Sequence, residues 1–489
     1  MLFNSYEFIF AFLPFTFFVY FYLNKKRLTE AAKGFVVAAS LFFYSWWNIV
    51  YLPLILGSIL FNYIIGKSLS KKNELHRVSK KSLLTVGIIA NVSLLGYYKY
   101  SDFFISNINR VADSEISLLH LTLPLAISFF TFQQIAYLVD SYRGQCHEYD
   151  FINYAAFVTF FPQLIAGPIV HHKEMMPQFA RSRNKVINYE NIAKGLFIFS
   201  IGLFKKVIIA DTFATWATAG FDKVASLNFF EAWATSYFYT FQLYFDFSGY
   251  TDMAIGAALL FNIKLPLNFN SPYKATSLID FWHRWHMTLT RFVNAYIFNP
   301  IVRSYKTYTY SKGMLAIFIS MVIIGFWHGA SWMFVFFGSL HGVGLVINHI
   351  WKKLVKIQLP KLVGWFLTFN FFNISVIFFR AKEWDDAMKV LGGMLGLHGI
   401  VFPYMLASPL SFLSDYGVEF GNWVPSINGN KWILVWLAGC FIIILAFKNS
   451  NEKLDTFVLN YKTAIFTGIC FISSLLYFDT ISDFLYFNF

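Results

Sequence analysis

A single histidine, His328, interrupts an apolar stretch that is long enough to cross a membrane. The residues around it, 325–332, read GFWHGASW. An ionisable side chain is costly in hydrocarbon, and its presence there indicates a functional site. Histidine suits proton transfer because its unperturbed pKa lies closest to neutrality. The sequence therefore predicts that His328 handles a proton inside a buried passage.

The neighbours of His328 support this interpretation and leave a second one open. Gly325 and Gly329 lack side chains, so another backbone or a thin substrate can approach closely. Trp327 and Trp332 are expected to wall a narrow passage. Burial favours the neutral imidazole, which is the form that accepts a proton. The alternative is a structural histidine that only hydrogen-bonds a neighbouring helix.

A second unusual cluster, DFWHRWH, occupies residues 280–286. His283 and His286 are three residues apart and would share one face of a helix. Such a pair can bind a metal, but no nearby Asp, Glu or Cys supplies a further ligand at a suitable spacing. We therefore predict no metal site, and we expect His286 to orient a substrate beside His328.

The aromatic and basic residues of the same cluster have two interpretations. Arg284 is expected to meet a phosphate or carboxylate at the cytoplasmic mouth of the passage. The alternative is a membrane-interface helix in which Trp282, Arg284 and Trp285 have no chemical role.

Polar side chains also recur in one long apolar segment. They are Asp246, Ser248, Tyr250 and Asp252. Two carboxylates in such a segment need ionic partners or water. The cations considered as their partners are Arg284, Arg291 and Lys264. A structural ion pair and a catalytic role both remain open for these acids.

Two more histidines, His341 and His349, follow His328 within the next apolar run. His341 lies thirteen residues beyond His328, a rotation of about 220° at roughly 100° per residue of helix. His341 should therefore face away from His328. We expect packing or interfacial roles for His341 and His349.

The composition is that of a membrane protein. Of the 489 residues, 57% are hydrophobic and 13% are charged, against roughly 25% charged in soluble domains. The formal net charge is +13, and the Lys and Arg residues concentrate in short loops beside apolar runs, as in the positive-inside rule. This pattern predicts contact with membrane lipids. It does not predict a nucleic-acid partner, because the basic residues form no aromatic-interleaved groove.

Twelve apolar runs mark candidate membrane-spanning helices. They cover residues 6–23, 34–48, 51–69, 83–100, 118–140, 193–210, 230–261, 313–325, 327–350, 363–380, 432–448 and 463–478. Basic loops near 24–33, 70–82 and 171–185 are predicted to be cytoplasmic, which places the N-terminus outside. Because no long polar linker is visible, we predict a single domain, 1–489.

Two other segments are interrupted in ways that plain spans are not. The first, 160–169, contains Pro162 and Pro168, and the second, 265–273, leads toward the cluster at 280–286. A helix broken within a membrane must satisfy its freed backbone groups inside protein or beside water. Both segments are therefore predicted to be re-entrant elements that line a cavity.

Taken together, these segments resemble the membrane-bound O-acyltransferase (MBOAT) superfamily, and within it the bacterial alginate O-acetyltransferase branch. The matching motifs are AGPI (166–169), GLFKKV (202–207), DFSGYTDMAIG (246–256), NFNSPY (268–273), DFWHRWH (280–286) and GFWHGASW (325–332). The terminal FLYFNF (484–489) is similar too. The order and spacing of the motifs carry the resemblance.

The resemblance implies an all-α polytopic membrane protein with the MBOAT fold, in which about 11–13 transmembrane helices and re-entrant helices surround a central funnel. It also implies an O-acyltransferase in the cytoplasmic (inner) membrane of a bacterium. The family's invariant histidine corresponds to His328 and its second histidine to His286. Substrate binding is assigned to Arg284, Trp285, Trp327, Trp332, Asp246, Ser248 and Asn270.

The same resemblance implies the substrates. The donor would be acetyl-CoA or a similar thioester that enters the funnel from the cytoplasm, with no bound cofactor. The acetyl group would cross the membrane to an extracytoplasmic polysaccharide such as alginate. Transfer would be direct or through a periplasmic or extracellular acyl-transferring protein.

Two other functions remain open. Within the same fold, the chain could transfer another acyl group, such as D-alanine, from a carrier protein to teichoic acid. A transporter or channel would also have broken helices and polar residues near the bilayer midplane. The sequence has no G-x-S-x-G, Walker A or dinucleotide-binding motif, which disfavours a serine hydrolase, an ATP-driven pump and a redox enzyme.

Overall fold

The computed structural model describes residues 1–70, 79–146, 150–429, 432–478 and 484–485. Helices dominate these residues, and the strands among them, β1 (Ile400–Pro403) and β2 (Val418–Gly421), are short and parallel. The chain is an all-α polytopic membrane protein, as the sequence predicts. Most of the predicted basic loop near 70–82 and the terminal residues 486–489 lie outside the described residues.

The α-helices fall into three groups along the chain. The N-terminal group is α1 (Leu13–Lys25), α2 (Thr29–Ser45), α3 (Leu52–Ser70), α4 (Lys80–Leu95), α5 (Ser101–Ala112), α6 (Ile127–Tyr142), α7 (Phe151–Thr159), α8 (Phe161–Leu164) and α9 (His172–Ala180). The central group is α10 (Tyr189–Phe204), α11 (Asp211–Thr218), α12 (Phe229–Leu260), α13 (Leu278–Trp282), α14 (Met287–Val293) and α15 (Asn299–Ser304). The C-terminal group is α16 (Tyr310–His328), α17 (Trp332–Ile350), α18 (Lys361–Arg380), α19 (Trp384–Met394), α20 (Trp432–Ala446), α21 (Ser450–Asp455) and α22 (Tyr461–Leu475).

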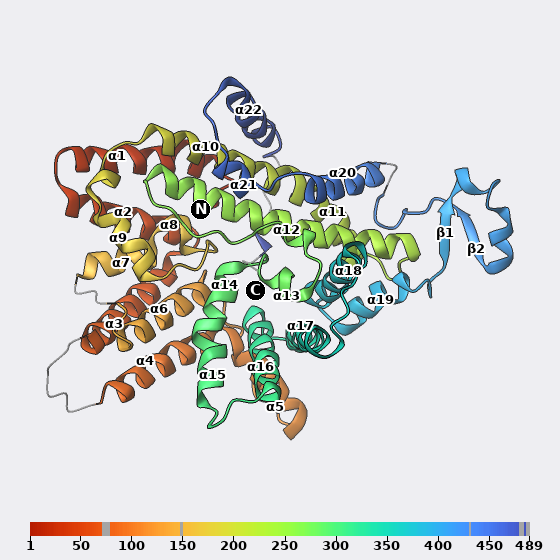
Figure 1. The fold of residues 1–489 in the computed structure, drawn as a ribbon, viewed down its shortest axis with the longest axis horizontal. Coiled ribbons are helices and arrows are strands. Elements are labelled where there is room, and N and C mark those ends of the chain that lie inside the picture. Colours follow the sequence, from red (N-terminus) through yellow and green to blue (C-terminus); the bar gives the residue numbers. More distant parts are fainter. Residues whose placement is uncertain (71–78, 147–149, 430–431, 479–483, 486–489) are drawn as a thin grey trace.

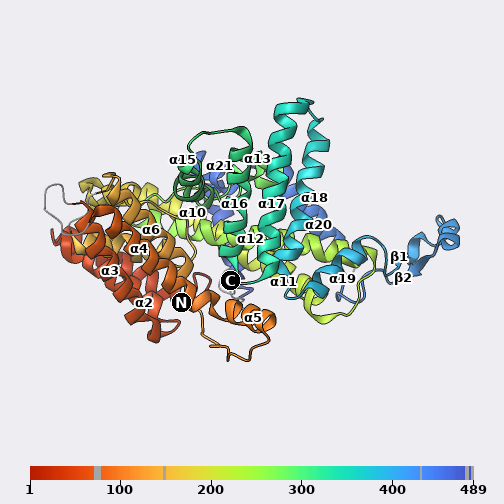
Figure 2. The ribbon, with the colours of Figure 1, turned by 90° about the horizontal axis from the view of Figure 1, so that it is seen from below.

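The long helix α12 forms the centre of the molecule. It packs along α10 and also contacts α11, α18 and α19 (Figure 1). In Figure 2 the helices α16, α17 and α18 stand side by side and cross the direction of α12. The N-terminal helices α2, α3, α4 and α6 gather at one end, and the strands lie at the opposite end (Figure 1).

Paired glycines let α10 and α12 lie close together. A Cβ added at Gly202 would lie 2.5 Å from the Gly249 carbonyl oxygen, and one added at Gly249 would lie 2.7 Å from the Gly202 carbonyl oxygen. Gly195 and Gly256 form an equivalent pair, with added Cβ atoms at 2.9 and 2.7 Å from the opposite carbonyl oxygens. Small residues at such contacts allow helix backbones to approach directly within a membrane.

Helices α16 and α17 form a hairpin that fixes the position of His328. The chain leaves α16 at His328 and enters α17 at Trp332. Between the two helices, an added Cβ at Gly325 would meet backbone atoms of Gly338, 2.7 Å away at Cα. Gly325 is thus a site of close backbone approach, and His328 lies at the turn of the hairpin.

Five described helical segments are long and apolar enough to cross a membrane. They are Glu7–Lys25, Ile49–Ser70, Tyr310–His328, Trp332–Val355 and Lys361–Arg380. The apolar helices α20 and α22 are shorter, at 15 residues each. The predicted total of spans, and the re-entrant character of the broken segments, stay predictions.

Two predicted span boundaries are wrong. The run 118–140 is helical only from Ile127, because Pro124 and the left-handed Ala126 (φ 60°) precede α6. The boundary placed between 325 and 327 falls instead at Gly329, whose extended backbone (φ −162°) ends α16. Small apolar residues there conceal the turn, because hydropathy does not distinguish a turn from a helix.

Both interrupted segments are largely non-helical and lie against the core. The chain between α8 and α9 has no regular structure, and residues 160–172 are all buried. Residues 263–270 are also non-helical, and Asn268 and Phe269 within them are buried. Thr288 of α14 contacts both segments: its Oγ1 accepts from the Ile169 backbone N–H at 3.1 Å and donates to Asn268 Oδ1 at 2.8 Å.

Candidate active site

His328 is buried in an aromatic enclosure at the end of α16, with 5% of the residue exposed. The rings of Trp327, Phe379 and Phe337 lie at centroid distances of 4.9, 5.2 and 6.5 Å from the imidazole. Trp327 also stacks on Phe132 of α6 at 4.7 Å. Rotation of the imidazole is therefore restricted by large rigid side chains on several helices.

Trp332 lies outside this enclosure, contrary to the expectation that it walls a passage beside His328. The residue is 53% exposed, its ring contacts Phe103 at 5.6 Å, and its Nε1 donates to Asn107 Oδ1 at 2.9 Å. The turn at 329–331 explains the difference, because it carries Trp332 out of α16 and onto α5.

His286 occupies the position before α14 with a left-handed backbone, φ 43°, and is 1% exposed. Its Nδ1 lies 2.9 Å from Asn268 Oδ1. That oxygen also accepts from the Thr288 hydroxyl at 2.8 Å and from the Thr288 backbone N–H at 3.3 Å. Because an amide oxygen only accepts, Nδ1 of His286 carries the hydrogen and Nε2 is the acceptor nitrogen.

Asn268 is the residue of the NFNSPY segment that reaches the site. It is fully buried, whereas Asn270, the residue assigned to substrate, is exposed. Asn270 Oδ1 accepts from Asn449 Nδ2 at 3.0 Å. Nothing in the sequence separates the two asparagines except position, because the segment has no helical or strand period from which burial can be read.

The structure brings His286 and His328 into one region. Phe132 stacks on Phe292 of α14 at 4.3 Å and on Trp327 of α16 at 4.7 Å. This aromatic stack ties the helix that follows His286 to the end of the helix that carries His328.

His341 has the packing role expected for it but not the expected geometry. It is fully buried; its Nδ1 accepts from Trp282 Nε1 at 3.3 Å, and its Nε2 pairs with Ser375 Oγ at 2.9 Å. The rotation of about 220° counted along one helix does not apply, because His328 and His341 lie on different helices of a hairpin. Phe337 contacts both imidazoles, at 6.5 and 4.6 Å.

Arg284 and Trp285 lie apart from the His328 enclosure. The Arg284 guanidinium pairs with Asp280 at 2.7 Å, and both side chains are 33% exposed. Trp285 is buried and packs against Phe281 and Phe372, with ring centroids at 5.7 and 5.0 Å. Arg284 is thus placed near solvent, and Trp285 belongs to the core.

The buried acids of α12 pair with lysines that follow α10. Lys206 Nζ lies 2.8 Å from Asp246 and 2.7 Å from Asp211, and Lys205 Nζ lies 2.7 Å from Asp252. Ser248 Oγ is 3.4 Å from Lys205 Nζ. These contacts assign Asp246, Ser248 and Asp252 to the packing of α10 against α12.

The acids pair with Lys205 and Lys206 and not with the predicted cations, so that prediction is wrong. Arg284 pairs with Asp280, and Arg291 pairs with Glu174 at 2.6 Å. Lys264 is exposed. The packing of α10 on α12 determines which residues pair. Residues close to the acids in the sequence do not reveal these partners.

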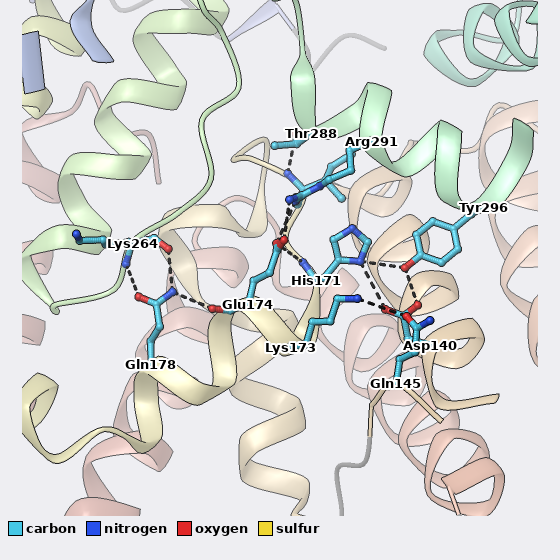
Figure 3. Close-up of polar contacts among 11 residues, drawn as sticks. Asp140, Gln145, His171, Lys173, Glu174, Gln178, Lys264, Thr288, Arg291 and Tyr296 are labelled. Atoms are coloured by element: carbon cyan, nitrogen blue, oxygen red, sulfur yellow. Dashed lines mark hydrogen bonds and ion pairs between the residues drawn. The ribbon is translucent and has the colours of Figure 1, made fainter. Parts of the chain in front are cut away.

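A polar network that the sequence does not reveal surrounds Asp140, at the end of α6. Tyr296 donates from its hydroxyl to Asp140 Oδ1 at 2.8 Å and lies 2.9 Å from His171 Nδ1, which is 3.6 Å from Asp140 Oδ2 (Figure 3). Beside it, Arg291 of α14 binds Glu174 through two hydrogen bonds of 2.6 and 3.0 Å (Figure 3). The network anchors the broken segment before α9 to α14.

Two adjoining cavities lie near the segment 171–185, since Arg291, which lines the first, pairs with Glu174. The first has a volume of about 610 Å³ and the second about 270 Å³. Both are lined by Trp282, His283, Thr290 and Asn294. The second also reaches Ile324 of α16, which is four residues before His328 and so shares its helix face.

A third cavity, of about 260 Å³, begins just past His328. Its lining includes Lys99, Asp102, Gly329 and Ser331. The end of α16 therefore separates a cavity that follows the helix face from a cavity beyond its terminus. Among the described residues, no three His, Cys, Asp or Glu side chains are grouped to hold a metal ion.

Comparisons with known proteins show the family to which the chain is related. The model of the membrane-bound O-acyltransferase family, MBOAT, matches residues 7–380. The peptidoglycan O-acetyltransferase of Helicobacter pylori is 45% identical over 533 residues, covering 100% of this chain and 98% of that protein. The probable alginate O-acetylase of Pseudomonas aeruginosa is 34% identical over 401 residues, covering 81% of this chain and 75% of that protein.

A more distant relative has a different named activity. The teichoic acid D-alanyltransferase of Streptococcus thermophilus is 27% identical over 287 residues, which cover 52% of this chain and 68% of that protein. All three relatives are named for transfer of an acyl group. With a matching family model over most of its length and buried histidines at the end of α16 and before α14, the chain belongs to the membrane-bound O-acyltransferase family.

Proposed function

We propose that the protein moves an acetyl group from cytoplasmic acetyl-CoA across the bacterial inner membrane for O-acetylation of a cell-envelope polysaccharide. The relative named for peptidoglycan O-acetylation is aligned along the whole chain, while the alginate relative is aligned along 81% of it. Peptidoglycan is therefore the first acceptor to test, and alginate is the second.

The observation that carries the proposal is the place of His328 between cavities. One cavity follows its helix face as far as Ile324, and the other begins at Gly329. A donor in the first and an acceptor hydroxyl in the second would meet at the imidazole. A buried base at such a meeting point suits transfer of an acyl group between two compartments.

In the proposed reaction, His328 accepts the proton of the acceptor hydroxyl as its oxygen attacks the thioester carbonyl carbon. The resulting tetrahedral intermediate breaks its C–S bond, and the imidazolium returns the proton to the departing thiolate of coenzyme A. The acceptor hydroxyl belongs to the polysaccharide or to a periplasmic or extracellular acyl-transferring protein. General-base assistance of this kind contributes roughly 10²–10⁴-fold to the rate.

His286 is proposed to orient the acyl group during this transfer. Asn268 accepts from Nδ1 of its ring, Thr288 donates to the same Asn268 oxygen, and Nε2 is the nitrogen proposed to contact the acyl group. Fixed polar groups at a reacting carbonyl act without reorganising during the reaction. Arg284 is proposed to meet the phosphates of the donor, as a partly exposed guanidinium outside the enclosure.

The D-alanyl relative keeps a second donor under consideration. The test supplies purified protein in lipid nanodiscs with ¹⁴C-acetyl-CoA or with a carrier protein loaded with ¹⁴C-D-alanine, and measures label in an added glycan. Label from acetyl-CoA alone is expected. Label in the glycan from the carrier protein alone would show that the protein transfers D-alanine and not acetyl. Movement of a solute without loss of either thioester would identify a transporter.

A further inference from the structure

Lys99 directs its ammonium group at the end of the helix that carries His328. It lies in the π-helical segment η3 (Gly96–Tyr100), which continues α4. Its Nζ donates to the carbonyl oxygens of Trp327 at 2.6 Å and His328 at 3.0 Å, and to Ser128 Oγ at 3.3 Å. An ammonium group has three N–H donors, so these three acceptors account for all of them.

The end of α16 needs such donors. The last carbonyl groups of a helix have no partner within the helix, and Gly329 turns to an extended backbone directly after His328. The hydroxyl of Tyr100 donates to the Phe326 carbonyl at 3.0 Å. Two adjacent residues of η3 therefore bind three consecutive carbonyls of α16, the last of which belongs to His328.

The charge of Lys99 is also directed at this helix end. Across the described part of the chain, no Asp or Glu carboxylate forms an ion pair with Lys99. Asp102 lines the third cavity together with Lys99, but its carboxylate accepts from the backbone N–H groups of Leu119 and His120 at 2.7 and 3.0 Å. A cation at a helix C-terminus interacts favourably with the negative end of the helix dipole.

The contact also joins three elements around the catalytic region. Ser128 lies at the start of α6, one turn before Phe132, whose ring stacks on Trp327 at 4.7 Å. Lys99 thus connects η3, α6 and the end of α16, and Trp327 is held by a stacked ring and by its carbonyl. Loss of the ammonium would release the backbone of Trp327 and His328 without removing a side chain from the enclosure.

We propose that Lys99 is a positioning residue that holds the terminus of α16, and with it the imidazole of His328, in the geometry required for acyl transfer. The proposal rests on the function proposed above for His328. It assigns Lys99 no hydrogen bond to substrate, although the residue lines the third cavity, because its three N–H donors are already engaged. A misplacement of about 1 Å at a reacting group can lower a rate by on the order of 10²-fold.

The test compares Lys99→Met, Lys99→Arg and Lys389→Met as purified full-length proteins. Lys389 is the matched control, because its Nζ also donates to two backbone carbonyls, those of Phe221 at 2.7 Å and Val224 at 2.8 Å. Acetyl transfer gives kcat and the KM for acetyl-CoA. Diethyl pyrocarbonate, with mass spectrometry of the peptide that contains His328, reports exposure of the imidazole independently of activity.

Lys99→Met should lower kcat by roughly 10–100-fold with KM within about threefold of wild type, and should speed labelling of His328 on the order of tenfold. Lys99→Arg should restore most of kcat, and Lys389→Met should keep both kcat and labelling. If Lys99→Met does not fold, Lys99→Gln replaces it, because glutamine keeps two N–H donors without the charge. The same decrease in kcat and the same faster labelling of His328 are expected.

Wild-type kcat and labelling in Lys99→Met would overturn the positioning role, as would an equal loss in Lys389→Met. A rise in KM with unchanged kcat would also overturn it, because that result indicates substrate binding. Unaltered transfer by His328→Ala would instead refute the proposed function, and the labelling comparison would still decide whether Lys99 positions His328.

Discussion

The backbone of His286 has an unusual conformation that points to a functional role. Its φ of 43° lies in the left-handed region, which costs a non-glycine residue free energy and persists where surrounding contacts impose it. Here the contacts are those of Asn268 with the imidazole and with Thr288. With this backbone the imidazole reaches Asn268, a position that a helical backbone at His286 would not give it.

A substitution that keeps this backbone separates the role of the ring from that of the fold. Asparagine tolerates the left-handed region, so His286→Asn should fold and unfold at a temperature close to that of wild type. Its acetyl-transfer rate should fall by about tenfold or more, because the oriented ring is lost. Rates from radiolabelled acetyl-CoA and a thermal unfolding curve test this, and an unchanged rate in a folded variant would show that the ring is not used.

At the residue scale the sequence singles out His328 and His286 as candidates, but it does not reveal the residues that contact them. An intramembrane histidine is conspicuous in any apolar run. Asn268, Thr288 and Lys99 act through contacts between segments that are far apart in the chain. Such contacts leave no local pattern, so only the folded chain reveals them.

At the scale of the elements, α10 and the lysines that follow it meet α12 through paired glycines and paired charges. Gly202 and Gly249 allow backbone contact, and Lys205 and Lys206 reach Asp252 and Asp246 across the same interface. Since both acids are buried, each needs its lysine to avoid an uncompensated charge. The small size of the glycines and the charges of the lysine–aspartate pairs therefore both specify this interface.

Gly202→Ala should destabilise the protein, because the added Cβ would lie 2.5 Å from the Gly249 carbonyl oxygen and overpacking typically costs about 1–3 kcal/mol. Gly439→Ala in α20 is the matched control, since no atom lies within 4 Å of its added Cβ. It should be neutral or stabilising, as alanine favours a helix by about 0.5–1 kcal/mol over glycine. Thermal unfolding in detergent compares them, and equal stability would argue against direct backbone contact.

Lys206→Met should be more damaging than a surface change of the same kind. Removing one partner of a buried ion pair costs about 3–5 kcal/mol, and Lys206 contacts both Asp211 and Asp246. The double variant Lys206→Met with Asp246→Asn should recover part of the loss, which unfolding curves of the single and double variants would measure. Additive losses would show that the pair is not coupled.

Element positions were predictable where an apolar run coincides with one helix. The run 230–261 corresponds to the continuous helix α12, Phe229–Leu260, and 363–380 lies within α18. The run 118–140 and the boundary near 326 were misplaced, because Pro124 and Gly329 end or delay helices within apolar sequence. Hydropathy measures the preference of a segment for lipid over water, and it does not predict where the backbone turns within an apolar segment.

At the scale of the whole molecule, the end of α16 lies between cavities on two sides. The cavities of about 610 and 270 Å³ share a lining at His283 and Asn294, and the cavity of about 260 Å³ starts at Gly329. The proposed reaction requires the two substrates to reach His328 from these two sides. The resemblance at sequence level implied such a funnel, and the residues alone indicated only a buried proton-handling site.

The most direct test is mass spectrometry of cell-envelope glycans from cells that produce wild-type protein, His328→Ala or His398→Ala at equal abundance in the membrane. His398 is an exposed histidine near β1 and serves as the control. We predict normal O-acetylation with wild type and His398→Ala, and a loss of roughly 10²-fold or more with His328→Ala. O-acetylation by His328→Ala at the wild-type level would contradict the central role of this histidine.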